Sequence, residues 1–277
     1  MENKTGQILV LGSNGKTGSR VVQKLEALKV SVRKGSRSAT PSFDWEKPDN
    51  WAAVLEGVKS VYITFQPDLA VPGSDEAIRT LVHLAEEAGV EKLVLLSGRG
   101  EKEAQDCETI VRNSRLKWTI VRASWFCQNF SESYMHDPVV YGHVSLPAGD
   151  VKEPFIDADD IADVVVAALT EEGHDSKLYE VTGPRLLSFR EAVAEIAEAV
   201  GRPIVYEQLS IKEYATQLAA FEVPQEYVGL LSYLFSEVLD GRNQSVTNGV
   251  EEALGRKPKD FSEYVKAAVA SGAWELK

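Results

Sequence analysis

Three glycines spaced three residues apart stand near the start of the chain, in a segment that could bind phosphate. The segment reads Gly12, Ser13, Asn14, Gly15, Lys16, Thr17, Gly18. Glycines in this pattern permit a sharp turn after a strand, close approach of the backbone to a pyrophosphate, and close packing of a helix on the strand. Amides at the helix start would then bind the phosphates. An ordinary turn can show the same spacing, but the apolar run before it and the helical pattern after it favour a dinucleotide site.

Cations follow the second predicted strand, which spans residues 29–33. NAD-binding chains place a carboxylate about 20 residues beyond the first glycine, where it binds the ribose 2′-hydroxyl. In this chain Arg33 stands there, and Lys34 and Arg37 follow it. Guanidinium groups would bind a 2′-phosphate through charge-assisted hydrogen bonds, so we expect NADP(H) to be preferred over NAD(H). The alternative is that these cations are solvated loop residues.

Two further strand ends are expected to contact the cofactor. Apolar runs predict strands at 59–65 and 92–97, and ligands of open α/β sheets bind at the carboxyl ends of strands. The residues at these ends are Phe65, Gln66, Pro67, Ser97 and Gly98. The first three could equally form a plain loop exit. Ser97 is a weak catalytic candidate as well, because its hydroxyl could bond the nicotinamide amide or a substrate, or merely cap its strand.

Strands and helices alternate through the first half of the chain, with helices predicted at 48–57, 74–88 and 101–113. This order predicts an α/β fold, a doubly wound (Rossmann) parallel sheet with right-handed crossovers. We expect residues 1–150 to form the NAD(P)-binding domain, with a sheet contribution from about 151–185. Residues 186–277 are expected to form a smaller, mostly helical C-terminal substrate-binding region.

An aromatic run follows the strand predicted at 118–122. Aromatic side chains often seal a core, but after a strand end they can also form the walls of a pocket for a flat substrate. The candidate substrate-binding residues are Trp125, Phe126, Asn129, Phe130 and Tyr134. His136 is a weak candidate for a proton donor. The acids at 157–163 are expected to cap a helix, and no pair of histidines has metal-ligand spacing, so no metal site is predicted.

The composition limits the partners. A formal net charge of −12 over 277 residues disfavours binding to nucleic acid or an anionic membrane. No apolar run approaches the roughly 20 residues that span a bilayer, and we expect Cys107 and Cys127 to be separate reduced thiols. These features predict a cytoplasmic protein with a small-molecule substrate. A homodimer or a regulatory protein partner stays open.

Further motifs join the glycine segment in a fixed order. They are Leu95-Leu96-Ser97-Gly98, Trp118-Thr119-Ile120-Val121-Arg122, Pro154-Phe155-Ile156-Asp157 and Tyr179-Glu180-Val181-Thr182-Gly183-Pro184. Through about Tyr206 this set resembles the NmrA-like branch of the atypical short-chain dehydrogenase/reductases. Within that branch, Gly15-Lys16-Thr17 and Gly35-Ser36-Arg37-Ser38 are similar to the ergot-alkaloid iminium reductases (agroclavine dehydrogenase, festuclavine synthase). The resemblance implies an NADP(H) site. It also implies a role as a quinone, azo-dye or iminium reductase, or as a redox sensor without turnover.

The wider superfamily reduces carbonyls with a tyrosine acid and a lysine four residues later. None of the nine tyrosines in this sequence has lysine at that offset, which would cost ketone reduction about 10²–10⁴-fold in rate. Quinones and iminium ions need less help, because positioning supplies most of the catalysis. We therefore predict an NADP(H)-dependent oxidoreductase that transfers hydride to a small conjugated electrophile of quinone, azo or iminium type. The alternatives are a non-catalytic NADP(H)-binding redox sensor and, less favoured, a scaffold with a vestigial site.

Overall fold

A computed structural model describes residues 6–275, and the chain divides into two compact units. The first, called the sheet unit below, comprises Met1–Ala123, Ala158–Val181 and Asn248–Arg256. The second, called the aromatic unit, comprises Ser124–Asp157, Thr182–Thr247 and Lys257–Lys277. This division differs from the expected boundaries near 150 and 186. The chain leaves the sheet at Ala123 rather than near 150, and a late segment, 248–256, returns to it.

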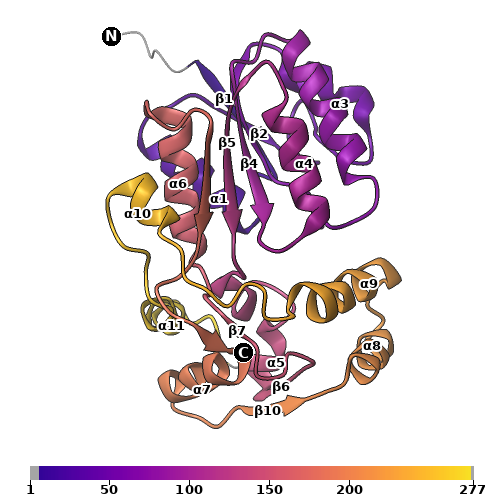
Figure 1. Cartoon of the computed structure of the whole chain (residues 1–277), viewed down its shortest axis with the longest axis vertical. Coiled ribbons are helices and arrows are strands. Elements are labelled where there is room, and N and C mark those ends of the chain that lie inside the picture. Colours follow the sequence, from indigo (N-terminus) through magenta and orange to yellow (C-terminus); the bar gives the residue numbers. More distant parts are fainter. Residues whose placement is uncertain (1–5, 276–277) are drawn as a thin grey trace. The chain divides into compact units, whose positions relative to one another are not determined.

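The sheet unit is built on six parallel strands in the order β2-β1-β3-β4-β5-β8 (Figure 1). Their bounds are β1 Gln7–Leu11, β2 Val32–Gly35, β3 Val58–Ile63, β4 Lys92–Gly98, β5 Lys117–Ala123 and β8 Lys177–Val181. The chain runs from β1 outward to β2 and then crosses to β3 on the other side of β1. This reversal makes the carboxyl ends of β1 and β3 the topological switch point of the sheet, where open α/β sheets bind ligands. The predicted doubly wound fold is confirmed.

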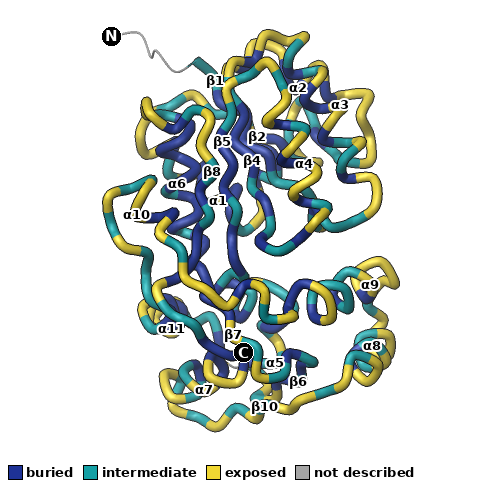
Figure 2. Tube along the Cα trace, in the orientation of Figure 1, coloured by how far each residue is buried: buried dark blue, intermediate teal, exposed yellow. Residues whose placement is uncertain are grey.

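Helices cover both faces of this sheet, which explains why its strands are almost wholly apolar (Figure 2). Helices α1 (Lys16–Ala27) and α6 (Ala158–Thr170) pack together, and α10 (Gly249–Leu254) contacts α6 and β8. Helices α2 (Trp51–Leu55), α3 (Ser74–Glu87) and α4 (Lys102–Arg112) pack in sequence, α2 on α3 and α3 on α4. A 3₁₀ turn, Pro48–Asn50, precedes α2. The helices thus hold every strand end of the sheet in place.

The acids at the start of α6 pair with cations instead of converging on one point. Asp160 lies 2.8 Å from Arg256, and Asp163 lies 2.6 Å from Arg256 and 2.7 Å from Lys24. These ion pairs join α6 to α1 and to the end of α10. The negative charges also lie at the helix start, where they complement the helix dipole.

The aromatic unit contains two small sheets and a set of helices around a phenylalanine core. β6 (His143–Leu146) pairs in parallel with β10 (Val205–Gln208), and β7 (Lys152–Glu153) pairs antiparallel with β9 (Leu187–Ser188). The helical elements are the 3₁₀ turn Cys127–Phe130, α5 His136–Tyr141, α7 Phe189–Val200, α8 Ile211–Ala220, α9 Gln225–Tyr233, the π-helical turn Leu234–Val238 and α11 Phe261–Ala270. The core is closed by contacts among the rings of Phe130, Phe155, Phe189 and Phe261.

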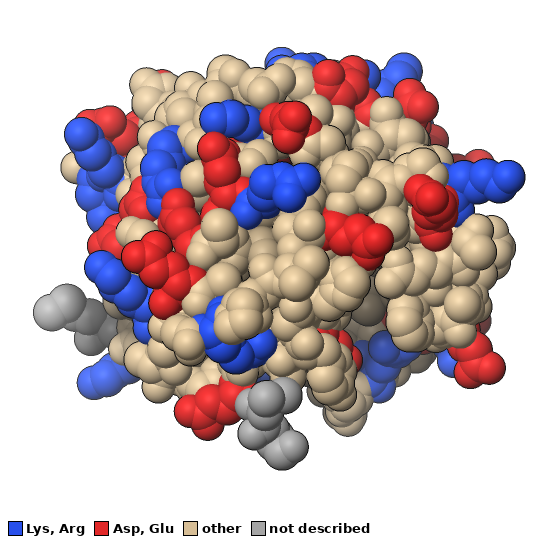
Figure 3. Space-filling view, turned by 90° about the horizontal axis from the view of Figure 1, so that it is seen from below, with Lys and Arg blue, Asp and Glu red and all other residues tan. Residues whose placement is uncertain are grey.

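Charges of both signs are interspersed over the face of the molecule drawn in Figure 3. On this face no broad basic area of the kind that binds nucleic acid is visible, in keeping with the net charge of −12. Among residues 6–275, none of the helices combines the length and the apolar character needed to cross a bilayer.

Candidate functional site

The glycine segment links β1 to α1 as a tight turn. Gly12 has a positive φ of 63°, and Thr64, at the end of β3, donates to the carbonyl of Leu11 at 3.3 Å. A Cβ atom at Gly12 would overlap the Thr64 hydroxyl, and one at Gly18 would overlap the Gly12 carbonyl. Only glycine therefore lets the loop lie this close to β3 and to the first turn of α1.

Helix α1 begins without a side-chain cap. Its N-cap is Gly15, which is extended and carries no capping side chain, and the first turn contains no acid. The first-turn amides of any helix lack an acceptor within the helix, and the helix dipole places positive potential there. The start of α1 is therefore suited to an anion, and phosphate binding at the glycine loop stays a prediction.

The loop after β2 lies beside the glycine segment. The amide of Asn14 donates to the hydroxyl of Ser38 at 3.4 Å, and the hydroxyls of Ser36 and Ser38 are 3.2 Å apart. Arg37 stands between these serines and is exposed. The loop thus places two hydroxyls and one exposed guanidinium next to the predicted phosphate site.

Arg33 is placed differently. It lies within β2, and its Nη1 donates to the carbonyls of Val54 and Glu56, at 2.8 and 2.7 Å. These carbonyls belong to the end of α2, so the guanidinium helps to hold α2 against the sheet edge. Arg33 as a 2′-phosphate ligand stays a prediction, and the geometry favours Arg37.

Phe65, Gln66 and Pro67 follow the end of β3, at the switch point of the sheet. Trp45 donates to the carbonyl of Thr64 at 3.1 Å and packs on the ring of Phe65 at 4.6 Å. Phe65 is half-buried, whereas Gln66 and Pro67 are exposed. The segment is therefore anchored on one side and open on the other, as a ligand-contacting strand exit would need.

A charged network fills the carboxyl ends of β4, β5 and β8. Ser97 donates to Glu108 at 2.6 Å, and Arg122 donates to both carboxylate oxygens of Glu108, at 2.8 and 2.5 Å. Glu180 accepts from Arg122 at 3.4 Å and from Arg99 at 2.6 Å. Since the Ser97 hydrogen is committed to Glu108, the hydroxyl can accept a hydrogen bond from a ligand amide but has no proton to give.

Glu108 and Arg99 are both more than nine-tenths buried. Buried charges are stable only when paired and hydrogen-bonded, and the network supplies both conditions. Four of its members come from α4, β5, β8 and the segment after β4, so no local sequence pattern could have predicted that they meet. The network fixes the position of Ser97 and of Gly98 beside it.

The aromatic run after β5 belongs to the aromatic unit. Trp125 packs edge-on against Phe189 at 5.2 Å and on Phe235 at 5.1 Å. Phe130 is fully buried and its carbonyl accepts from Trp274, so its ring belongs to the phenylalanine core, and its role as a substrate contact stays a prediction. The half-buried members of the run are Trp125, Phe126, Asn129 and Tyr134.

The ring of His136 is held at both nitrogens. Nδ1 lies 2.7 Å from Asp137, and Nε2 lies 2.9 Å from the carbonyl of Ala273. A histidine fixed in this way ties α5 to the C-terminal segment and has no ring nitrogen left to meet a substrate. This arrangement disfavours His136 as a proton donor.

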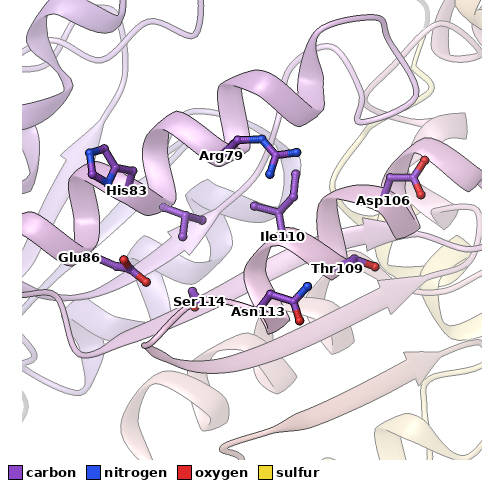
Figure 4. A pocket seen from close by; sticks show the side chains of 9 residues that line it. Arg79, His83, Glu86, Asp106, Thr109, Ile110, Asn113 and Ser114 are labelled. Carbon is purple, nitrogen blue, oxygen red and sulfur yellow. The ribbon is translucent and has the colours of Figure 1, made fainter.

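A surface groove of about 400 Å³ lies between α3 and α4 (Figure 4). Its lining mixes Arg79, His83 and Glu86 of α3 with Asp106 and Thr109 of α4. Arg115 donates to Glu86 at 3.0 Å, which already satisfies one of these charges. None of the predicted site residues lines the groove, so it is separate from the strand ends described above.

Residues 12–172 match a protein-family model described as NAD(P)H-binding. The matched segment contains the glycine loop, the loop after β2, the ends of β3 and β4, and four network residues, Ser97, Arg99, Glu108 and Arg122, whereas Glu180 lies beyond it. The chain belongs to this NAD(P)H-binding family. A glycine turn followed by a helix start without a side-chain cap or a first-turn acid is chemically suited to the pyrophosphate of such a cofactor.

Two curated relatives of this NAD(P)H-binding protein match nearly its full length. The NAD(P)H azoreductase of Xenophilus azovorans is 30% identical, over 96% of this chain and 99% of the azoreductase. Festuclavine synthase II of Penicillium roqueforti is 30% identical, over 92% of this chain and 96% of the synthase. The predicted kinship with the ergot-alkaloid reductases is confirmed.

The crystal structure of an NADPH-dependent quinone oxidoreductase from Escherichia coli, in complex with NADPH, has a similar fold. The TM-score is 0.80, with 18% identity over 95% of this chain and 99% of that one. At this identity the likeness shows the fold alone. The family match and the two relatives at 30% identity make this protein a member of a family of NAD(P)H-dependent reductases.

Proposed function

We propose that this protein is an NADP(H)-dependent reductase of the cytoplasm that transfers hydride to a small conjugated electrophile of the quinone, azo or iminium type. The observation that carries the proposal is the uncapped start of α1 behind the glycine loop, at the switch point of the sheet. The azoreductase and clavine-synthase relatives support the reaction class.

The preference for NADP(H) rests on the loop after β2. The exposed Arg37 and the hydroxyls of Ser36 and Ser38 can donate to a 2′-phosphate, and the hydrogen bond from Asn14 to Ser38 holds them near the pyrophosphate site. At the carboxyl end of β2, no acid in this loop takes the place of the ribose-binding carboxylate.

Replacing Arg37 tests this assignment. We expect Arg37→Ala to weaken NADPH binding about 10- to 100-fold and to leave NADH binding nearly unchanged, since one charge-assisted contact is worth about 1.5–3 kcal/mol. The matched control is Arg33→Ala, which should lower the melting temperature through the loss of its bonds to α2 and shift the cofactor ratio little. A reversed result, with the NADPH preference lost only in Arg33→Ala, would assign the 2′-phosphate to Arg33.

The proposed substrate class rests on two observations: the strand ends carry no tyrosine-lysine acid pair, and an aromatic run follows β5. The sequence has no tyrosine-lysine pair, and Ser97 has already donated its hydrogen, which favours acceptors that take hydride readily. Trp125, Phe126, Asn129 and Tyr134 stay candidates for substrate contacts. The Tyr134 hydroxyl is buried and has no hydrogen-bond partner among the described residues, so a polar atom of a substrate could satisfy it.

The test is a fluorescence titration with NADPH and NADH, followed by addition of a naphthoquinone, an azo dye and a cyclic iminium ion. Binding of NADPH with oxidation on addition of any acceptor supports the reductase. Tight binding without oxidation by any member of the panel would establish the non-catalytic redox sensor instead. Failure to bind either nucleotide would contradict both.

A further inference from the structure

Two carboxyl groups meet at the ends of neighbouring strands, outside the glycine loop and the charged network. Asp68 follows β3 and Glu101 follows β4, directly before α4. Their side chains share a hydrogen bond, which requires a proton on one of them. The amide of Ala70 donates to Asp68 at 2.9 Å and stabilises its charged form, so the proton belongs on Glu101.

The surroundings of Glu101 favour the neutral acid. The residue is only 8% exposed, and its Oε2 atom is buried without a hydrogen-bond partner among residues 6–275. Burial raises the pKa of Glu101 well above its ordinary value, and the negative charges of Asp68, Glu103 and Glu108 act in the same direction. Burial also raises the pKa of Asp68, so the two carboxyl groups resist being charged at the same time.

The carboxyl group of Glu101 lies directly on Gly98, the last residue of β4. A Cβ atom at Gly98 would overlap the carboxyl group. Gly98 is one of the proposed cofactor contacts, so a held proton lies at the strand end where an acceptor would meet the nicotinamide. Ser97, its neighbour, has given its hydrogen to Glu108 and cannot supply a proton.

We propose that Glu101, holding the proton that it shares with Asp68, is the proton source of the reduction. The inference rests on the proposed reductase function and narrows its substrate class. In quinone reduction the C4–H bond of the reduced nicotinamide breaks, its hydride forms a new bond to one carbonyl oxygen, and the other oxygen takes the proton of Glu101. Glu101 is left as a carboxylate and regains a proton from solvent through the half-buried Asp68.

The three classes of acceptor differ in whether they need a proton in addition to the hydride. An azo group takes hydride on one nitrogen and the Glu101 proton on the other, which gives a hydrazine. An iminium carbon takes hydride alone and becomes a neutral amine, so it needs no acid. The site is therefore suited to acceptors that require one hydride and one proton, namely quinones and azo compounds.

The first test uses the cofactor-free protein. Infrared difference spectra are recorded across a pH titration. The C=O stretch of a protonated carboxyl group should persist at pH values well above the ordinary glutamate pKa of about 4.3. The band should be missing in Glu101→Gln, which keeps a donor toward Asp68, and retained in the control Asp106→Asn, an exposed acid of α4 that pairs with Lys102. A wild-type spectrum without this band above pH 6 would overturn the shared proton.

The second test compares acceptors. Glu101→Gln should lower kcat with the quinone and the azo dye about 100-fold or more, and leave kcat with the preformed iminium ion within about twofold. The Kd for NADPH should not change. In Asp68→Asn, loss of the neighbouring charge should move the alkaline limit of quinone reduction to lower pH.

Equal losses on all three acceptors, or a quinone kcat within about threefold of wild type, would overturn the proton-source role while the reductase stands. If the wild-type protein oxidises no NADPH with any acceptor, the proposed function fails and the role of Glu101 in reduction fails with it. The infrared band would then still show the proton shared by Asp68 and Glu101, but this proton would have no role in reduction. The two failures are therefore distinguishable.

Discussion

The start of α1 in the sheet unit and the starts of three helices in the aromatic unit solve the same problem in opposite ways. Helices α7, α8 and α11 each begin with a complete capping box, from Ser188, Ser210 and Asp260 to a glutamate three residues later. In α7 the Ser188 hydroxyl accepts from the Glu191 amide at 3.1 Å, and Glu191 accepts from the Ser188 amide at 2.7 Å. Helix α1 has glycine at this position and no acid behind it.

The difference leaves the start of α1 without the protein groups that stabilise the starts of α7, α8 and α11. A side-chain cap stabilises a helix by about 1 kcal/mol relative to alanine, and a first-turn acid adds to this. Helices α7, α8 and α11 use both devices, and α3, α4 and α9 lack a side-chain cap but carry an acid in the first turn. At α1 the chain uses neither, and an anionic ligand can supply the missing acceptors and charge.

The largest expected effect comes from giving α1 the cap that it lacks. We expect Gly15→Asp to weaken NADPH binding at least about 100-fold, because the carboxylate would accept from the first-turn amides and repel the pyrophosphate. A Cβ atom at Gly15 would lie 3.2 Å from the Gly12 carbonyl oxygen, so the side chain fits after a slight adjustment and the melting temperature should not fall. Calorimetric titration and thermal unfolding measure the two quantities.

The matched variant is Gly15→Ser, which caps without a charge and should lose only about 10-fold in NADPH affinity. Equal and small losses for both variants would show that the open start of α1 does not face the phosphates. The missing cap at α1 would then not indicate a ligand site.

A smaller effect is expected from Gly18→Ala, in which the new methyl group would overlap the Gly12 carbonyl. Displacement of the loop should cost about 1–3 kcal/mol in the free energy of unfolding and weaken NADPH binding as well. The control is Gly229→Ala in α9, where nothing lies within 4 Å of the new atom and stability should rise by up to about 1 kcal/mol. Urea unfolding of both variants measures these changes. An unchanged free energy of unfolding in Gly18→Ala would disprove the close packing of α1 on its loop.

The smallest effect concerns a capped helix start. Arg185 donates to Asp260 at 2.7 and 2.9 Å and holds the pKa of that carboxyl well below its ordinary value. Stability from a depressed pKa is present above the unfolded value of about 4 and is lost as pH falls toward the folded value. Asp260→Asn keeps a capping oxygen. It should lower the free energy of unfolding by about 1 kcal/mol at pH 7 and by less at pH 3, and the affinity for NADPH should not change. A pH-independent difference would contradict the ion-pair account.

The features that sequence reasoning found are those that short segments encode. The glycine spacing, the apolar strands and the order of elements predicted the parallel sheet and the loop, because each signal lies within one βα unit. The placement of Arg33 could not be predicted, since its partners Val54 and Glu56 lie about 20 residues away on α2. Its position in the sequence suggested a phosphate ligand, and its bonds serve the fold.

Contacts between residues that follow different strands of the sheet could not be predicted from the sequence. Asp68 and Glu101 lie on different loops, and only the parallel alignment of β3 and β4 brings them together. The packing of Phe130 could not be predicted for a related reason, because an aromatic residue after a strand has the same sequence pattern whether it faces a ligand or three other phenylalanine rings. A buried acid with an unsatisfied oxygen can be recognised only once the packing around it is known.

The sheet unit is discontinuous along the chain, and this has a consequence during synthesis. Its last strand, β8, is translated more than 50 residues after β5, with part of the aromatic unit in between. Until β8 emerges from the ribosome, β5 is an open sheet edge that could pair with another nascent chain. The helix α10 that packs on β8 arrives later still. A fragment ending near residue 150 would carry this edge permanently and should aggregate rather than fold as a nucleotide-binding domain.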